Sequence, residues 1–340
     1  MGRVFAARIG ANESVFGPSP QAIAAMSEAA AGVWRYGDPE AFELRAAIAA
    51  HHGVAPANVM IGEGIDALLG NLVRLTVAEG APVVTSAGAY PTFNYHVTGF
   101  GGLLHPAPYR DDAEDPAALL ALAQATGAGL VYLANPDNPM GSWRPAAEVT
   151  ALVEALPQGA LLCLDEAYSD FAPPEALPPL DADEPRLIRM RTFSKAYGMA
   201  GARIGYALGE AGLIAAFDRV RNHFGVNRIA QAGALAALAD RDWLTSVLAE
   251  VATAKARIVA IATGQGLRPL PSATNFVTID CGRDGDFARA VVRGLIARGV
   301  FVRMPFVAPQ DRCIRVTAGR PADLDAFAAA LPGALAEAAG

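Results

Sequence analysis

Short apolar runs alternate with helical patterns from about residue 57 to residue 210, and this alternation constrains the fold more than any other feature. Seven runs rich in Val, Ile and Leu predict strands, at 58–62, 82–87, 102–107, 129–134, 160–166, 186–193 and 203–209. Between several of them lie amphipathic or Ala-rich stretches that predict helices. The alternation predicts an α/β domain of three layers (αβα), with helices on both faces of a mostly parallel sheet.

A second, smaller unit follows a long stretch of helix-forming residues at 229–262. Its strands are expected at 274–281, 299–306 and 313–319, and its helices near 284–298 and 321–337. A length of 340 residues suits two domains, at roughly 100–200 residues each. We therefore expect an N-terminal arm and the start of the small domain at 1–30, a large domain at 31–235 and a small α+β domain at 236–340.

Composition excludes two classes of partner. The net charge of −7 argues against nucleic acid, because a phosphate-binding surface needs a basic stripe. No apolar run reaches the roughly 18 residues of a membrane span, and the N-terminus lacks the apolar core of a signal peptide. Three cysteines that are far apart in the sequence fit a reducing compartment. We expect a mature cytoplasmic protein that binds neither membrane nor nucleic acid.

Lysine is almost absent from this chain. Of 27 basic residues, 25 are Arg and only Lys195 and Lys255 are Lys. A lysine that persists under such a bias is a candidate for chemistry that Arg cannot do, namely reaction as a neutral amine. Lys255 lies in a helical pattern, where a solvated position is expected. The histidines show no spacing typical of metal ligands, so no metal site is expected.

Polar residues follow several predicted strands, at the sheet edge where parallel sheets bind ligands. A glycine turn at 61–67 opens a helix and could hold an anion or a dinucleotide, or be only a tight turn. Tyr90 and the rigid Asn-Pro segment 135–141 follow two further strands. Asp165 ends another strand, with Tyr168 three residues later. A buried carboxylate at such a place needs a cationic or donor partner.

The most informative segment spans residues 191–205. Thr192, Ser194 and Arg203 could together hold a phosphate, and Lys195 lies among them. A lysine beside a phosphate site suits a phosphorylated aromatic aldehyde with which it forms a Schiff base. That description fits pyridoxal 5'-phosphate.

From about residue 8 to residue 332, the chain resembles the fold-type I, pyridoxal-phosphate-dependent aminotransferases of classes I and II. It is most similar to the histidinol-phosphate aminotransferase branch. The matching segments are 11–20, 35–49, 62–69, 135–141, 165–171, 191–206 and 313–319. The segment 191–206 is highly specific. The resemblance implies an enzyme that moves an amino group from a donor to a 2-oxo acid by a ping-pong mechanism.

The resemblance also implies roles for individual residues. Lys195 matches the lysine that binds the cofactor and moves the proton, and Asp165 matches the partner of the ring nitrogen. Asn138 and Tyr168 match donors to the ring oxygen, and Tyr90 matches the stacked ring.

Other matches concern the phosphate, the second subunit and the substrate. The phosphate cradle corresponds to Gly64, Ile65, Thr192, Ser194 and Arg203. Tyr36 matches a residue that reaches the cofactor of a neighbouring subunit, which implies a homodimer. Arg315 matches the clamp for the substrate carboxylate, and Asn12 lies in the segment that folds over the substrate.

Departures from the branch leave the substrate open. The chain begins only a few residues before Asn12, so we expect it to lack the branch's longer N-terminal extension. Met140 replaces a small hydroxyl residue, and Phe224 offers no hydroxyl to a substrate phosphate. These differences favour an amino acid with an apolar or aromatic side chain, its carboxylate on Arg315. The alternative is histidinol phosphate, with its phosphate on Arg303 or other residues.

Two further functions compete with transamination. A lyase that resembles threonine-phosphate decarboxylase would share nearly all of these motifs. A nucleotide-binding module built on the glycine turn at 61–67 would leave the segment around Lys195 unexplained.

Overall fold

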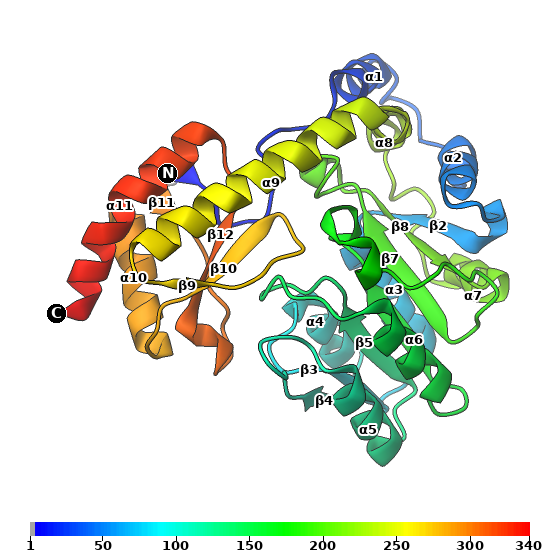
Figure 1. Ribbon diagram of the computed structural model, residues 1–340. Helices are drawn as coiled ribbons and strands as arrows, with labels where there is room; N and C mark the ends of the chain where they lie inside the picture. The colour runs from blue at the N-terminus through cyan, green and yellow to red at the C-terminus, as the bar shows by residue number, and fades with distance from the viewer. Residues whose placement is uncertain (1–3) are drawn as a thin grey trace.

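The computed structural model describes residues 4–340, and its largest element is a seven-stranded sheet (Figure 1). The strand order is β2-β8-β7-β6-β5-β3-β4, and β8 is antiparallel to both of its neighbours while the other pairs are parallel. The bounds are β2 Val59–Gly62, β3 Pro82–Ser86, β4 Leu103–Ala107, β5 Leu130–Ala134, β6 Leu161–Asp165, β7 Leu187–Thr192 and β8 Gly205–Gly209. The prediction of a mostly parallel sheet is confirmed.

Residues of the central strands alternate between two hydrophobic clusters, because successive side chains point to opposite faces of a sheet. In β5, Leu130 and Tyr132 pack with α3 (Ile65–Thr76) and α4 (Pro91–Gly99). Val131 and Leu133 of the same strand pack with α5 (Pro116–Thr126) and α6 (Ala146–Ala155). Helices thus cover both faces of the sheet, which confirms the three-layer αβα prediction.

Further helices cover the β2–β8 edge and connect the two parts of the molecule. Helices α1 (Pro20–Ala30) and α2 (Phe42–His52) pack with α8 (Arg228–Ala239), and α7 spans Ala211–Ala216. The long α9 (Arg241–Gly264) then runs toward the smaller part (Figure 1). The helix-forming residues predicted at 229–262 form two helices, α8 and α9, which meet at Asp240, whose side chain caps α9 by accepting from the Trp243 amide.

The smaller part contains two short sheets and two helices. Its strands are β9 Arg268–Pro269, β10 Phe276–Asp280 and β12 Cys313–Thr317, with β10 in the middle, and β1 Ala7–Arg8 pairs with β11 Val300–Phe301. Its helices are α10 Gly285–Ala297 and α11 Pro321–Ala339. The strand expected over 299–306 ends at Phe301, because the chain turns toward Arg315 and makes only an isolated bridge with it at Arg303. No pattern in residues 1–30 indicated β1.

Single-turn 3₁₀ helices complete the fold, at Pro56–Asn58, Ser169–Phe171, Pro174–Ala176, Ala200–Ala202, Phe217–Arg219 and Gln310–Arg312. Among residues 4–340, no helix is both long enough and apolar enough to cross a membrane. Strands β5, β6 and β7 end at the same edge of the large sheet, and β12 of the smaller part lies beyond that edge. This arrangement creates the site described next.

Candidate active site

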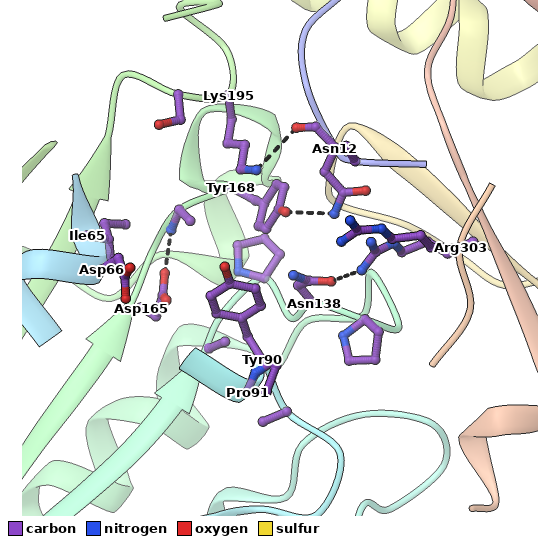
Figure 2. Close-up of a pocket in the computed structure, with 18 of the residues that line it drawn as sticks. Asn12, Ile65, Asp66, Tyr90, Pro91, Asn138, Asp165, Tyr168, Lys195 and Arg303 are labelled. Carbon is purple, nitrogen blue, oxygen red and sulfur yellow. Dashed lines mark hydrogen bonds between the residues drawn. The ribbon is translucent and has the colours of Figure 1, made fainter. Parts of the chain in front are cut away.

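A cavity of about 460 Å³ lies between the carboxyl ends of the large sheet's strands and strand β12. Figure 2 shows Ile65 and Asp66 on one side of it and Arg303 on the opposite side, with Tyr90 and Tyr168 between them. Most of the predicted site residues line it: Asn12, Ile65, Tyr90, Asn138, Asp165, Tyr168, Thr192, Ser194, Lys195, Arg203 and Arg315. The fold thus gathers residues from seven widely separated segments around one space.

Lys195 follows β7 and points into the cavity (Figure 2). Its Nζ donates a hydrogen bond to the Asn12 carbonyl at 3.2 Å and lies 5.4 Å from the centre of the Tyr168 ring. Burial lowers the pKa of this amine to about 8. A substantial fraction of Lys195 is therefore neutral near physiological pH, the form in which an amine is a nucleophile or a base.

Asp165 is the last residue of β6, and its side chain is held by two donors. The Tyr132 hydroxyl donates to Oδ2 at 2.7 Å, and the Ala167 amide donates to Oδ1 at 2.9 Å. Burial raises the pKa of Asp165, while these hydrogen bonds and the charge of Lys195 oppose the rise. Each carboxylate oxygen still has a lone pair available for a further donor.

Asn12 connects the N-terminal segment to both sides of the cavity. Its Nδ2 donates to the Tyr168 hydroxyl at 2.9 Å, and its Oδ1 accepts from the Thr317 hydroxyl at 3.1 Å. Its backbone carbonyl accepts from Asn275 as well as from Lys195. Burial raises the pKa of Tyr168 to about 12, so its hydroxyl stays protonated and able to donate.

Arg315 lies on β12 with its guanidinium buried at the other end of the cavity. It donates to Oδ1 of Asn138 and, at 3.3 Å, to the carbonyl of Gly10. Its Nε has no partner among the described residues, and burial lowers the pKa of the group. A buried guanidinium whose Nε–H has no acceptor favours binding of an anion.

The glycine turn before α3 brings a helix N-terminus to the opposite end. Gly64 has φ +85°, a conformation that residues with a Cβ rarely adopt, and a Cβ built there would lie 2.5 Å from Nη2 of Arg203. Arg203 donates only to backbone carbonyls, those of Ala200 and Glu63, and no carboxylate within residues 4–340 pairs with it. Thr192 and Ser194 lie at the same end, and the Ser194 amide donates to the Thr192 hydroxyl at 3.0 Å.

Comparison with known proteins identifies the family. The family model of class I and II aminotransferases matches residues 7–331. The chain belongs to the class I and II aminotransferases. Histidinol-phosphate aminotransferase 1 of Mesorhizobium japonicum is 36% identical over 332 residues, which cover 96% of this chain and 89% of that protein. A histidinol-phosphate aminotransferase of Anaeromyxobacter is 38% identical over 86% of this chain and 82% of its own length.

A solved structure gives the same assignment. Histidinol-phosphate aminotransferase from Sinorhizobium meliloti, in complex with pyridoxal 5'-phosphate, is 57% identical, with a TM-score of 0.97 over 98% of this chain and 92% of that one. This aminotransferase is of the histidinol-phosphate branch and uses pyridoxal phosphate as its cofactor. Because the chain is an enzyme of this family, the alternative hypothesis of a nucleotide-binding module built on the glycine turn at 61–67 is wrong.

The residues present fit this cofactor. The turn at Gly64 leaves space that a Cβ would fill, beside a guanidinium without an acidic partner and the N-terminus of α3, which together suit a phosphate. In the same cavity, Lys195 offers an amine of lowered pKa and Asp165 a buried carboxylate. These are the groups that an aldehyde and a ring nitrogen require.

Two predicted residues differ from the rest. Tyr36 does not line the cavity of its own chain; its side chain is exposed and its ring centre lies 4.8 Å from that of Phe224. Asn138 lines the cavity, but its amide oxygen accepts from Arg315. Its Nδ2 is the group that remains for a cofactor oxygen.

Sequence reasoning missed Tyr132, the buried donor to Asp165. Its position within an apolar strand indicated only core packing, and no local signal distinguishes it. Asn94, which also lines the cavity, has a buried amide oxygen without a partner among the described residues.

Proposed function

We propose that this aminotransferase takes the amino group from histidinol phosphate and transfers it to a 2-oxo acid. The observation that supports this proposal is the pair Arg303 and Arg315. The Arg315 amide donates to the Arg303 carbonyl at 2.6 Å, the Arg303 amide donates back at 3.3 Å, and both side chains line the same end of the cavity. Neither side chain has an ion-pair partner within residues 4–340.

The charge of this pair suits a phosphate monoester better than a carboxylate. A phosphate monoester has a charge of about −1.5 to −2 at neutral pH, and guanidinium groups recognise it through paired hydrogen bonds. A carboxylate, with one negative charge, would leave one of two neighbouring guanidiniums without a counterion. The relatives named as histidinol-phosphate aminotransferases support the same choice. We therefore prefer this donor to the apolar or aromatic amino acid that the sequence favoured.

The imidazole ring of the donor needs an apolar surface and a hydrogen-bond acceptor. Other residues that line the cavity offer both. Met304, Phe306 and Val307 offer apolar surface against which a flat ring can pack. Glu13 lines the cavity, and its carboxylate has no hydrogen-bond or ion-pair partner in the described part of the chain. An imidazole N–H can donate to such an oxygen.

The cofactor residues keep the roles that the family resemblance assigns. When bound, pyridoxal phosphate supplies an aldehyde and a ring that withdraws electrons from the donor's amino-bearing carbon. Asp165, oriented by Tyr132, accepts a hydrogen bond from the protonated ring nitrogen. Lys195 Nζ would bind the cofactor aldehyde in the resting enzyme. Once the donor's amino group has replaced it there, the freed amine would accept the proton from the amino-bearing carbon. Phosphate oxygens are held by the backbone at Gly64 and Ile65 and by Thr192, Ser194 and Arg203, while Tyr90, Asn138 and Tyr168 contact the ring.

We also propose a cytoplasmic homodimer. Tyr36 is 79% exposed and lies against Phe224, which is itself exposed, and Trp34 and Phe42 are exposed nearby in the sequence. A second subunit would cover these aromatic rings and receive Tyr36 at its cofactor phosphate. We also propose the domain boundaries 1–30, 31–235 and 236–340 that the sequence pattern predicted. Ala7 and Ile9 pack in the hydrophobic cluster of the smaller part, whereas Ala22, Ala237 and Leu238 pack with the large sheet.

The donor is tested by single-turnover kinetics with the cofactor-loaded enzyme. Loss of the bound aldehyde's visible absorbance is followed after mixing with histidinol phosphate, phenylalanine or leucine. We expect kcat/KM to favour histidinol phosphate by about a hundredfold or more, which is about 2.7 kcal/mol of transition-state binding. A preference for phenylalanine or leucine contradicts the proposal.

Variants of Arg303 sharpen this test. We expect Arg303→Gln to raise KM for histidinol phosphate about tenfold or more, because one charge-assisted contact is worth about 1.5–3 kcal/mol. The same variant should change the constants for leucine little. Arg298→Gln, which removes a partly exposed guanidinium paired with Glu337 far from the cavity, is the matched control. Equal losses for both donors would contradict the assigned role.

A further inference from the structure

Thr278 and Arg315 are direct partners in the antiparallel ladder between β10 and β12. Directly opposite residues in such a ladder place their side chains on the same face. Both side chains leave that face toward the same loop, the Asn-Pro segment 135–141 of the large sheet. They reach consecutive residues there: Arg315 donates to the Asn138 side chain, and the Thr278 hydroxyl donates to the Pro139 carbonyl at 2.6 Å.

The contact of Thr278 is well placed to fix the loop. Thr278 is fully buried, so its hydroxyl has no access to water. No other donor in the described residues contacts the Pro139 carbonyl. Loss of the hydroxyl would therefore leave a buried carbonyl unsatisfied, which is costly, and the backbone next to Asn138 would be free to shift.

Other contacts bind the end of the loop to the smaller part. The Ala273 amide donates to the Gly141 carbonyl at 2.8 Å. Met140 is fully buried against Leu270 and Cys313, which belong to the segments around β10 and β12. This packing also gives a reason for a large apolar residue at position 140, where the branch has a small one. Hydrogen bonds and packing thus attach residues 138–141 to β10 and β12, although these residues belong to the large domain.

We propose that Thr278 is a positioning residue that makes the substrate-binding arginine and the cofactor-facing amide of Asn138 one rigid unit. The inference rests on the proposed roles of Arg315 and Asn138. Thr278 touches neither substrate nor cofactor. It holds the Pro139 carbonyl, and so fixes the distance between β12 and the amide that faces the cofactor. A displacement of Arg315 on binding an anion is then transmitted to Asn138.

The test compares Thr278→Val with Thr278→Ser in the cofactor-loaded enzyme. Valine keeps the shape of threonine and removes the donor, whereas serine keeps the donor. We expect Thr278→Val to weaken cofactor affinity, measured by absorbance titration of the apo-enzyme, and to lower kcat/KM about tenfold or more. It should also move the pH midpoint of the bound cofactor's visible absorbance. Thr278→Ser should restore cofactor affinity and kcat/KM to within about threefold of the unmodified enzyme. It should also return the pH midpoint of the absorbance to its original value.

Thr85→Val is the matched control. Thr85 is a buried threonine of β3 whose hydroxyl has no partner among residues 4–340, and it does not line the cavity. We expect this variant to leave affinity, turnover and the absorbance midpoint unchanged. If Thr278→Val differs from Thr85→Val only in thermal unfolding temperature, or if Thr278→Ser fails to restore the absorbance midpoint, the proposal is wrong. Cofactor affinity and absorbance do not depend on which donor the enzyme uses, so this outcome is distinct from failure of the proposed function.

Discussion

The phenolic hydroxyl of Tyr132 donates a 2.7 Å hydrogen bond to Oδ2 of Asp165, from the neighbouring strand of the sheet. Tyr132 is fully buried, and its ring stacks on that of Phe93 at 4.5 Å. The sheet core therefore fixes the orientation of the carboxylate before any ligand binds. Such preorganisation suits the role proposed for Asp165, in which the carboxylate accepts a hydrogen bond from a protonated ring nitrogen at a fixed geometry.

Removal of the charge at position 165 should lower turnover while the cofactor remains bound. In Asp165→Asn the phosphate cradle is intact, so we expect the cofactor to remain bound. The neutral amide cannot keep the ring nitrogen protonated, so turnover should fall by about a hundredfold or more, as for loss of about 2.7 kcal/mol. Tyr132→Phe, which removes only the orienting hydroxyl, should lose about tenfold. Asp242→Asn, an exposed change on α9, is the control, and near-normal turnover of Asp165→Asn with bound cofactor contradicts the role.

The chain's two lysines make the covalent site easy to test. Borohydride reduction of the loaded enzyme, followed by peptide mass mapping, should label Lys195 alone. Lys255 is an internal control, because burial lowers its pKa to about 8 as well, yet its Nζ donates to the Ser272 carbonyl and it does not line the cavity. Label on Lys255, or no label, would be evidence against the assignment.

Capture of the cofactor should depend on pH. Protonation removes the lone pair with which an amine attacks an aldehyde, so only neutral Lys195 reacts. Because its pKa is lowered to about 8, the rate of capture by the apo-enzyme should rise as pH increases, about tenfold per unit below pH 8, and level off above it. Stopped-flow absorbance between pH 6 and about 9.5 measures this. A profile that still rises steeply between about pH 9 and 10 would show that the amine has an ordinary lysine pKa.

Local patterns predicted most of the sheet and the site residues that follow its strands. Strands β5, β6 and β7 are continuous apolar runs, and Asp165, Thr192 and Lys195 stand directly at or after their ends. Parallel topology brings such ends together, so the sequence already placed these residues at one edge. The roles of Asn12 and Arg315 were available only through family resemblance, because neither stands at the end of a strand of the large sheet.

Contacts between distant segments were beyond prediction. The bridge between Arg303 and Arg315 depends on how the chain turns after β11, a two-residue strand with no periodicity to read. The hydrogen bond between Thr278 and Pro139 joins residues 139 positions apart. In the sequence Tyr132 is one more apolar residue of a strand, and only the pairing of β5 with β6 reveals its acceptor.

Glu166 forms buried ion pairs with two arginines, and we expect their loss to lower the free energy of unfolding strongly. Glu166 is buried and contacts Arg189 at 2.6 Å and Arg191 at 2.8 Å. Burial alone would raise its pKa, but the two arginines outweigh burial and hold that pKa below its usual range. Glu166→Gln should lower the free energy of unfolding by about 3–5 kcal/mol, because two buried guanidiniums lose their counterion.

Glu337→Gln is the control for that change, since Glu337 pairs with Arg298 at the surface and its loss should cost less than about 1 kcal/mol. Because the pKa of Glu166 is lowered in the folded state, its stabilisation is present above the ordinary carboxyl pKa and is lost as pH falls through the folded-state value. Chemical denaturation of the three proteins at pH 7 measures the difference. Similar losses for the two variants would refute the expectation.

Tyr36 should act across a subunit boundary. It is 79% exposed and absent from the cavity of its own chain, so a contact with cofactor phosphate requires a second copy. We expect a dimer in analytical sedimentation at micromolar concentration. Tyr36→Phe, which removes the hydroxyl and keeps the ring against Phe224, should leave the dimer intact and weaken cofactor affinity about tenfold or more, as for one lost hydrogen bond to a charged group. Tyr95→Phe alters a comparably exposed tyrosine of α4 and should change neither property. A fully active monomer, or equal cofactor affinities in the two variants, would remove the basis for a shared site.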